Sequence, residues 1–216
     1  MAAAAAGAFA EPPPRLRFGV VTVYTPRVMY LKYQPLANYL EVATGKPWDL
    51  VLVASYERAV EDICSGKLTM AYLGPYTYAR ARAACQVVPV VKLNTHGKAT
   101  YRGLVLVRVD SKLRRLEDLA GKSFGFGPPM STASCVVARS MLEDAGLHVG
   151  VDLTCRHYAR HEQAARAVLL GEVDACAVRD IVGDKFVARQ ALRVLARSDE
   201  IPNFVLALAP GSPPAL

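Results

Sequence analysis

Three hydroxyl side chains lie close together in the segment Ser131-Thr132-Ala133-Ser134, which is the part of this sequence best suited to bind an anion. The segment follows a short strand ending at Gly127 and the pair Pro128-Pro129, which stops regular structure, and it opens an amphipathic helix. The first amides of a helix lack partners within the helix and carry the positive end of its dipole, so amides and hydroxyls together can hold an oxyanion. An ordinary serine N-cap is the alternative, and the local sequence leaves both interpretations open.

Two further ring side chains open a pattern of residues that occurs twice. Tyr56 begins an amphipathic stretch that closes at Gly66, and His161 begins one that closes at Gly171, with ten residues from ring to glycine in both. Each glycine suits the left-handed residue that ends a helix, and a short apolar strand follows it. The repeat predicts two similar α/β lobes that grip a small ligand between them. The alternative is a coincidence of the kind that any α/β sequence produces.

Strands and helices alternate along the chain, which predicts sheets flanked by helices. We expect strands at 16–23, 50–54, 69–73, 88–93, 103–109, 123–126, 153–158, 174–178, 192–196 and 204–208. We expect helices at 33–43, 56–65, 76–85, 116–119, 132–145, 161–170 and 180–190.

The predicted fold class is α/β with two lobes, each a mainly parallel sheet flanked by helices, and a ligand cleft between the lobes. A first lobe of residues 15–106, completed by residues 200–216, is interrupted by a second lobe of residues 107–199. The polar segments 107–112 and 198–203 are the expected hinges.

The amino-acid composition limits the kinds of partner that are expected for this chain. The chain is 52% hydrophobic with a formal charge of +7, which favours anionic partners. Its Lys and Arg residues are scattered without a basic run, so nucleic acid is not expected. Residues 1–14 end in a small-x-small motif and prolines, which indicates the remnant of a signal peptide or a disordered tail. No segment has about eighteen uninterrupted apolar residues, as a membrane span requires.

The cysteines and histidines give no clear site. Five cysteines form no CxxC motif, and export would allow a disulfide whose pairing the sequence leaves open. Cys155, His157 and His161 are close in sequence, but a strand-to-helix change between the histidines makes their side chains diverge, so no metal is expected.

Several ordered motifs resemble the phosphate, phosphite and phosphonate-binding proteins of ABC transporters, which are periplasmic binding proteins of the second structural type. The motifs are YQPLANYL at 33–40, GKLTMAYLGPYTY at 66–78 after Tyr56, YRGLVLVR at 101–108, DLAGK at 118–122, PPMSTAS at 128–134, His161-Glu162 and GEVD at 171–174. The match runs from about residue 16 to residue 210.

The resemblance implies a set of ligand contacts. In that family, first-lobe tyrosines, a Ser-Thr-Ser helix start and a second-lobe His hold the phosphorus oxyanion. Carried over by motif, the contacts are Tyr56, Tyr101, Ser131, Thr132 and His161. We add Tyr76, Ser134 and Arg179 as candidates.

The chain also departs from the family pattern. Ala133 replaces the third hydroxyl, so one oxyanion hydrogen bond of roughly 1.5–3 kcal/mol is missing or relocated to Ser134. Arg179 stands where relatives often have an acidic residue facing the ligand's substituent. An Arg179 that faces the cleft suits a second anionic group such as a carboxylate, whereas the alternative is an ion pair with Asp180 or Glu172. No acidic residue stands around 202–204, so an ammonium-bearing ligand is less expected.

Relatives continue past the return strand with helices that finish the first lobe, whereas this sequence ends at GSPPAL. A truncated sequence or a short sensor-like form is therefore expected.

We expect a monomeric binding protein, periplasmic or otherwise exported, and associated with a membrane only through its partner. Hinge closure captures a small anionic ligand for an ABC permease. The alternative is the ligand-sensing domain of a signalling system, which binds a different small anion. An enzyme is not expected, because the sequence has no Gly-x-Ser-x-Gly elbow, no GxxxxGK[ST] loop and no convincing carboxylate pair. No cofactor is predicted.

Overall fold

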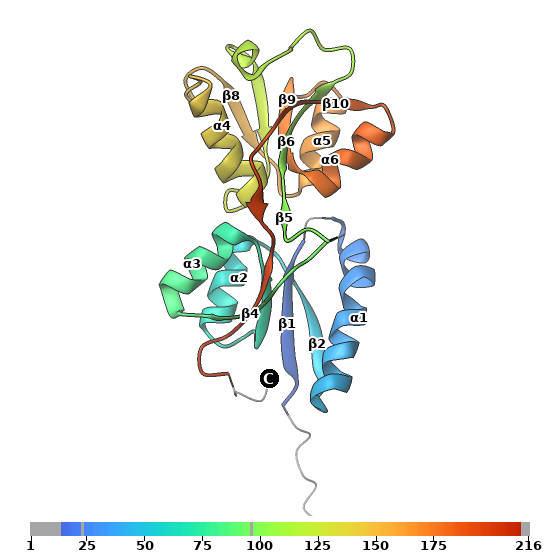
Figure 1. Cartoon of the computed structure of the whole chain (residues 1–216), viewed down its shortest axis with the longest axis vertical. Helices are drawn as coiled ribbons and strands as arrows, with labels where there is room; N and C mark the ends of the chain where they lie inside the picture. The colour runs from blue at the N-terminus through green and yellow to red at the C-terminus, as the bar shows by residue number, and fades with distance from the viewer. Residues whose placement is uncertain (1–13, 23, 96, 213–216) are drawn as a thin grey trace, which may run out of the picture.

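The computed structural model describes residues 14–212 except residues 23 and 96, and these residues form two lobes, each built on its own sheet (Figure 1). The leader or tail expected at 1–14 lies, apart from Pro14, outside the described residues. Within the described part of the chain, no helix combines the length and the apolar character that crossing a membrane requires.

The first lobe contains a five-stranded sheet in the order β2-β1-β3-β12-β4. Its strands are β1 (Leu16–Val21), β2 (Trp48–Val53), β3 (Met70–Leu73), β4 (Val88–Lys92) and β12 (Val205–Leu208). Helices α1 (Pro26–Thr44), α2 (Tyr56–Cys64) and α3 (Pro75–Cys85) follow the first three strands. Figure 1 shows α1 on one side of this sheet and α2 and α3 on the other.

The second lobe repeats this plan with a sheet in the order β10-β6-β9-β7-β8. Its strands are β6 (Gly103–Arg108), β7 (Ser123–Phe126), β8 (Thr154–His157), β9 (Ala175–Arg179) and β10 (Leu192–Arg197). Its helices are η1 (Leu116–Leu119), η2 (Thr132–Val137) with its continuation α4 (Ala138–Asp144), α5 (His161–Leu169) and α6 (Asp180–Ala188).

Both sheets are mixed rather than mainly parallel. In the first, β1 pairs in parallel with β2 and β3, whereas β12 runs antiparallel to β3 and β4. In the second, β7 is parallel to β8 and β9, whereas β6 runs antiparallel to β9 and β10. The strands that enter each sheet from the other lobe, β6 and β12, return in the opposite direction to the helix-linked strands, and this produces the antiparallel pairs.

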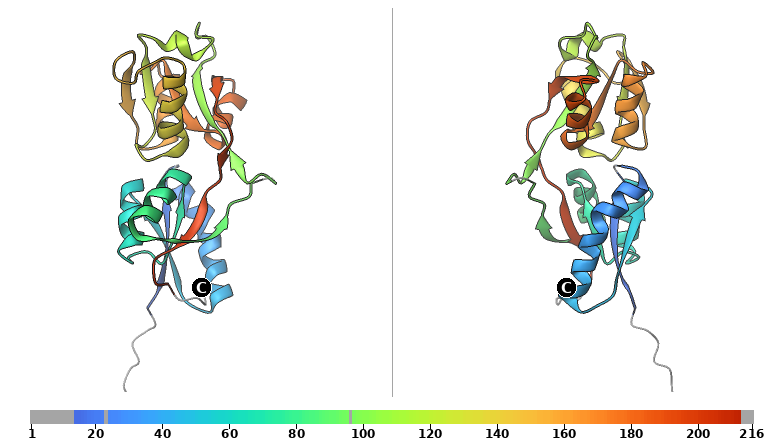
Figure 2. Two further views of the ribbon diagram at one scale, coloured as in Figure 1. Left: turned by 60° about the vertical axis from the view of Figure 1, so that its left-hand side comes forward. Right: turned by 90° about the vertical axis from the view of Figure 1, so that its right-hand side faces the viewer.

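A two-stranded ribbon connects the lobes. It consists of β5 (Thr100–Tyr101) and β11 (Ile201–Pro202), which pair antiparallel. Figure 2 shows both connections on the same side of the molecule. Because β6 already belongs to the second sheet from Gly103 onward, the chain crosses ahead of the expected hinge at 107–112, which lies at the end of β6.

Helix α1 begins at Pro26 and not at residue 33 as the sequence pattern suggested. Proline suits this first turn because the first amides of a helix have no partner within it, and Gly45 ends the helix at φ 65°. Pro35 lies inside the helix, where it removes one backbone hydrogen bond without ending the element. The earlier start adds Lys32 to the helix that already contained Tyr33, and both residues lie beside the cleft.

A disulfide joins Cys64 at the end of α2 to Cys85 at the end of α3, with the two Cα atoms 5.5 Å apart. The sequence left this pairing open because proximity of the two helix ends is a tertiary feature. Cys135, Cys155 and Cys176 are free. No group of three His, Cys, Asp or Glu side chains among the described residues is arranged to hold a metal ion.

Candidate functional site

Helix starts from both lobes meet at the interface between them. Tyr56 is the first residue of α2, His161 is the first residue of α5, and Ser131 caps η2. Arg179 ends β9 and caps α6. All four lie after the carboxyl ends of strands, where helices that follow parallel strands must begin, and where ligands of open α/β sheets bind.

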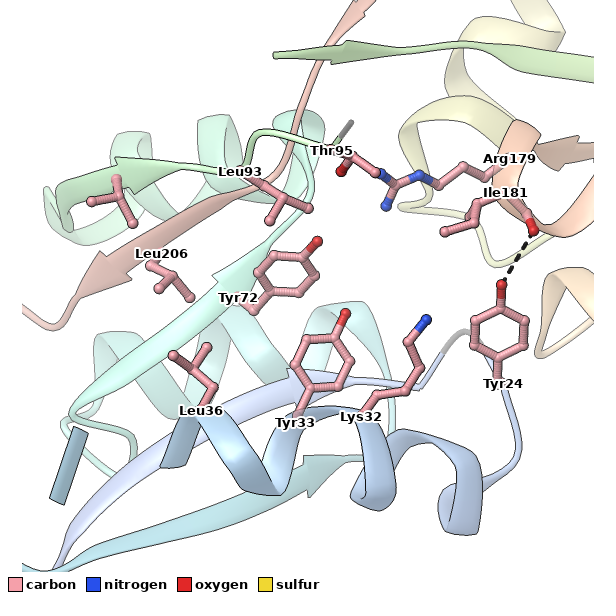
Figure 3. A pocket seen from close by; sticks show the side chains of 11 residues that line it. Tyr24, Lys32, Tyr33, Leu36, Tyr72, Leu93, Thr95, Arg179, Ile181 and Leu206 are labelled. Atoms are coloured by element: carbon pink, nitrogen blue, oxygen red, sulfur yellow. Dashed lines mark hydrogen bonds between the residues drawn. The ribbon is translucent and has the colours of Figure 1, made fainter. Parts of the chain in front are cut away.

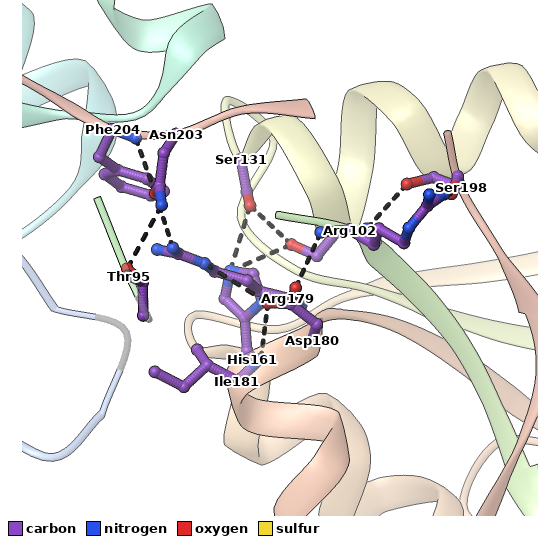
Figure 4. Close-up of polar contacts among 12 residues, drawn as sticks. Thr95, Arg102, Ser131, His161, Arg179, Asp180, Ile181, Ser198, Asn203 and Phe204 are labelled. Atoms are coloured by element: carbon purple, nitrogen blue, oxygen red, sulfur yellow. Dashed lines mark hydrogen bonds and ion pairs between the residues drawn. The ribbon is translucent and has the colours of Figure 1, made fainter. Parts of the chain in front are cut away.

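A buried group of two serines and one histidine forms the second-lobe side of the cleft (Figure 4). The Oγ of Ser134 donates to the Oγ of Ser131 at 2.8 Å. The Nε2 of His161 lies 3.1 Å from the Ser131 Oγ and 3.3 Å from the Ser134 Oγ. Ser134 therefore supplies a second hydroxyl beside Ser131, which offsets the loss of a hydroxyl at Ala133.

The protonation of His161 follows from its contacts. The backbone N–H of Arg179 donates to the Nδ1 of His161 at 2.9 Å, so Nδ1 carries a lone pair and the proton of the neutral ring is on Nε2. His161 is only 2% exposed, and this burial, with a smaller effect of the Arg179 charge, lowers its pKa from the ordinary 6.5 to about 3. His161 is thus a neutral hydrogen-bond donor at Nε2.

Ser131 is left with a proton to give to the cleft. Its oxygen accepts from Ser134 and from the Nε2–H of His161, which fills its accepting capacity. The hydroxyl hydrogen of Ser131 therefore points to a third partner. In this structure Tyr56 is beside it, and an oxyanion placed there would receive the same hydrogen bond.

Gly127 makes this close packing of hydroxyls feasible. A Cβ atom at this position would lie 2.0 Å from the Ser134 Oγ and 2.8 Å from its Cβ. Any side chain at residue 127 would therefore displace Ser134 and, through it, Ser131. The sequence marked Gly127 only as the end of a strand, and no local signal revealed its role.

The helix after Ser131 starts as a wide π turn. The amides of Cys135 and Val136 both donate to the Ser131 carbonyl oxygen at 3.1 Å. The amides of residues 132–134, at the very start of η2, precede the first of these bonds, so helix geometry gives them no acceptor within the helix. Such amides are available for an anion.

The first lobe contributes two buried phenols. Tyr56 is 3% exposed, and burial raises its pKa to about 12, with Ser131 and Arg179 partly offsetting the effect. Burial also raises the pKa of Tyr101 well above its ordinary value, while Arg179 and Thr132 oppose the shift. Both phenols are therefore neutral donors, which is the form that binds an oxyanion.

Thr132 and Tyr76 join the lobes directly. The backbone N–H of Tyr76 donates to the Oγ1 of Thr132 at 3.0 Å. The candidate contact from Tyr76 thus runs through its main chain at the start of α3, and the structure gives no hydrogen bond from its phenol to the serine and histidine group. A Cβ atom added to Gly74 would meet the Phe204 ring at 3.3 Å and would be in ordinary contact with the Thr132 Oγ1 at 3.6 Å.

Arg179 faces the cleft and is not a surface ion pair. It is 8% exposed, its Nη2 donates to the Oδ1 of Asn203 at 2.9 Å, and its Cζ lies over the ring of Tyr101 at 4.2 Å. Its Nε is 3.8 Å from the Oδ1 of Asp180, an ion-pair contact that is beyond hydrogen-bonding distance. Arg179 therefore faces the cleft and also keeps the Asp180 carboxylate as a neighbouring, largely buried counter-charge.

Four polar residues of the first lobe were not predicted to line the cleft. Tyr24, Lys32, Tyr33 and Tyr72 border a cavity of about 280 Å³ that Arg179 enters from the second lobe (Figure 3). One signal was available for Lys32, since Pro26 after Thr25 is typical of a helix start and would have placed Lys32 on the same helix as Tyr33. Tyr24 and Tyr72 had no such signal.

Two α/β lobes with mixed sheets, a ribbon between them and converging helix starts at their interface define a type II periplasmic binding protein, and this confirms the predicted fold class. Residues 18–216 match the family model described as ABC transporter, phosphonate, periplasmic substrate-binding protein. The chain belongs to this family, as the resemblance in its motifs predicted.

Individual relatives agree with this assignment. The chain is 26% identical over 192 residues to the phosphate-import protein PhnD of Mycolicibacterium smegmatis, a match covering 81% of this chain and 60% of the relative. The chain therefore spans less than two thirds of that relative's length.

Solved structures share the fold at lower identity. A binding protein component of a phosphonate ABC transporter from Pseudomonas aeruginosa superposes with a TM-score of 0.84 at 19% identity, covering 94% of this chain and 70% of that one. PhnD1 from Prochlorococcus marinus, solved in complex with methylphosphonate, superposes with a TM-score of 0.82 at 17% identity. The superposition covers 93% of this chain and 78% of that one.

The family comprises substrate-binding proteins and not enzymes, so the expectation that this chain is no enzyme is confirmed. The same match does not favour the alternative of a sensory domain in a signalling system.

Proposed function

We propose that this protein captures a small phosphorus oxyanion, of the phosphate, phosphite or phosphonate type, between its two lobes. The observation that carries the proposal is the group of Ser131, Ser134 and His161 facing the phenol of Tyr56 across the cleft. All of these groups are neutral. Ser134 and His161 donate to Ser131, which leaves the Ser131 hydroxyl and the Tyr56 phenol free to donate to a tetrahedral oxyanion. The family to which the chain belongs, and the relatives named for phosphate import and phosphonate transport, support this ligand class.

Capture proceeds by closure about the ribbon of β5 and β11. Among the described residues the Tyr76 amide donates to Thr132, and the hydroxyls of Thr77 and Tyr24 donate at 3.4 Å to the carbonyls of Met130 and Ile181. Arg179 of the second lobe also donates to Asn203 at 2.9 Å. Few polar bonds cross the interface, so a bound anion that contacts both lobes would shift the balance toward the closed form. A closed, loaded protein is what an ABC permease would recognise as its partner.

We place the protein outside the cytoplasm as a monomer. The family is described as periplasmic, and the Cys64–Cys85 disulfide is of a kind that persists in oxidising compartments. Association with a membrane would then arise through the permease.

The test is calorimetric titration of the purified protein with phosphate, phosphite, methylphosphonate and sulfate, repeated with Ser131→Ala. We expect saturable binding of at least one phosphorus oxyanion and a loss of roughly tenfold or more in the variant, because a hydrogen bond to a charged group contributes about 1.5–3 kcal/mol. Ser140→Ala, an exposed serine on α4, is the matched control and should bind as the wild type does. Equal affinity in Ser131→Ala and wild type would place the ligand elsewhere, and no binding of any phosphorus oxyanion would overturn the proposal.

A further inference from the structure

The cavity beside the oxyanion group is rich in cations and has no acid in its wall. Its volume is about 280 Å³. Its polar lining among the described residues consists of Tyr24, Lys32, Tyr33, Tyr72, Thr95 and Arg179, and its remaining lining is aliphatic. Figure 3 shows the hydroxyls of Tyr33 and Tyr72 and the amine of Lys32 pointing from the first lobe toward the opening that the Arg179 guanidinium enters.

Arg179 is buried with part of its hydrogen-bonding capacity unused. Its Nε has no hydrogen-bond partner among the described residues, although the side chain is more than nine-tenths buried. The carboxylate of Asp180 is a counter-charge 3.8 Å from this Nε but does not hydrogen-bond to it, and its oxygens accept from the amides of Arg102 at 2.8 Å and of Ile181 at 2.7 Å. A buried charge with an incomplete set of partners is costly, and an anion in the cavity would supply what is missing.

Two lysines lie near this cavity. Lys32 Nζ of the first lobe lies 5.3 Å from the centre of the Tyr24 ring, and Lys185 Nζ of α6 in the second lobe lies 4.4 Å from it. Burial chiefly, and then the charges of Lys185 and Arg179, lower the pKa of Lys32. Among the described residues no acid lines this cavity, whereas Asp180 and Asp184 line a neighbouring cavity that also borders Arg179, and Glu162 lines a third.

Tyr33 and Tyr72 add two neutral hydrogen-bond donors to the lining of this cavity. Burial raises the pKa of both phenols, and Arg179 opposes the shift in each. Their rings are 5.4 Å apart and stand on α1 and β3, so they form one wall of the cavity. An anion held there would receive hydrogen bonds from phenols as well as charge from Arg179 and Lys32.

Arg179 also connects this cavity to the oxyanion group. Its backbone N–H holds His161 at 2.9 Å, while its side chain reaches the cavity. A ligand whose phosphorus group is bound at Ser131 and His161 would therefore extend its substituent along Arg179.

From these contacts we infer that the ligand of this cleft is a short organophosphonate or phosphate ester whose substituent ends in a second anionic group, in the first place a carboxylate, which is bound by Arg179, Lys32, Tyr33 and Tyr72. This inference rests on the proposed function, since it requires the phosphorus group in the neighbouring site. A planar carboxylate suits the cavity at Arg179, because a guanidinium group binds carboxylates through paired N–H donors.

The test compares ligands that differ in charge at one end only. The full chain is titrated with phosphonoacetate, its isosteric neutral amide phosphonoacetamide, 2-aminoethylphosphonate and methylphosphonate. We expect phosphonoacetate to bind at least tenfold more tightly than the amide and 2-aminoethylphosphonate to bind most weakly of the four.

Two variants test whether residues of the cavity cause the preference for the acid over the amide. Lys32→Gln, on the exposed side of α1, should reduce the ratio of amide to acid dissociation constants about threefold or more, and Arg179→Met should reduce it further while weakening all four ligands. Lys67→Gln is the matched control, because it removes the same charge from an exposed site at the far end of α2 from Tyr56, and should leave the ratio as in wild type. Should Arg179→Met fail to fold, Lys32→Gln alone decides the assignment.

Two results separate failure of this inference from failure of the proposed function. Equal affinity for the acid and the amide in wild type, or a ratio that Lys32→Gln leaves unchanged, overturns the second anionic site while methylphosphonate binding keeps the proposed function intact. Absence of binding by every phosphorus compound removes the proposed function and the inference with it.

Discussion

The two lobes approach the same cleft with different chemistry. The second lobe presents Ser131, Ser134 and His161, which are neutral, buried and hydrogen-bonded to one another and to the backbone. The first lobe presents phenols and Lys32 on a more open surface, opposite the incompletely paired Arg179. The serine and histidine group thus has its hydrogen bonds within the protein, whereas the Arg179 Nε in the charged wall has no hydrogen-bond partner among the described residues and only an ion-pair contact with Asp180 at 3.8 Å. The difference suggests that the neutral group fixes the phosphorus end and the charged wall selects the substituent.

The largest effect is expected from breaking the neutral group through Gly127→Val. A Cβ at residue 127 would meet the Ser134 Oγ at 2.0 Å, so the serines must move away from His161. We expect phosphonate affinity to fall on the order of a thousandfold, because two or three buried hydrogen bonds of about 1–3 kcal/mol each are lost. Calorimetric titration with methylphosphonate measures this loss of affinity.

Gly66→Ala is the control for Gly127→Val. Gly66 has a φ of 73°, and a Cβ atom added there would have no neighbouring atom within 4 Å, so alanine strains the backbone without touching the cleft. It should lower the melting temperature and keep the affinity. If Gly127→Val binds as tightly as Gly66→Ala, the serine group does not hold the ligand.

The disulfide is a second difference between the lobes, since it cross-links two helices of the first lobe. Removing it with Cys64→Ser and Cys85→Ser together should lower the free energy of unfolding by about 3 kcal/mol, from the chain entropy of a 21-residue separation. Urea unfolding of the oxidised wild type and the double variant measures the change. The bridge is at the opposite end of α2 from Tyr56, so ligand affinity should stay within about twofold; a large loss of affinity would mean that the bridge positions Tyr56.

The neutral state of His161 predicts a pH dependence of stability. Below pH 6.5 the unfolded chain takes up a proton on this residue, whereas the folded protein does not until the pH approaches about 3. The unfolded state therefore binds more protons in this window, and stability falls as pH decreases. By pH 5 the cost reaches about 2 kcal/mol, at roughly 1.4 kcal/mol per pH unit.

The variant His161→Gln isolates this cost, because carboxylates titrate alike in both proteins. Urea unfolding at pH 8 and pH 5 should show a smaller loss of stability on acidification in the variant than in wild type. Identical losses would mean that His161 is charged in the folded protein, and the donor role assigned to its Nε2 would have to be revised.

The smallest effect is expected at the contact between the lobes. Thr132→Val keeps the shape of the side chain but removes the acceptor for the Tyr76 amide at 3.0 Å. We expect about a fivefold loss of affinity, corresponding to about 1 kcal/mol for one neutral hydrogen bond. The loss should appear chiefly as faster ligand release in stopped-flow measurements, because closure is weakened. Thr44→Val, whose hydroxyl bonds within the first lobe, is the control.

Much of the fold followed from local patterns. The repeated units at Tyr56 and His161 are helices that begin at those residues, and the strands lie close to their predicted positions. Local patterns failed at α1, which begins at Pro26 although the expected helix began at residue 33. That error left out Lys32, a residue of α1 that borders the charged cavity.

The family, the two-lobed plan and the helix start at Ser131 could be predicted from the sequence, because these depend on residue order and on hydrogen bonding between near neighbours. In contrast, the pairing of Cys64 with Cys85, the room that Gly127 leaves for Ser134 and the position of Arg179 in the cleft became visible in the folded protein. Each of these depends on which surfaces of distant segments approach one another. Such an approach is set by the packing of whole helices and sheets, and the spacing of residues along the chain does not record it.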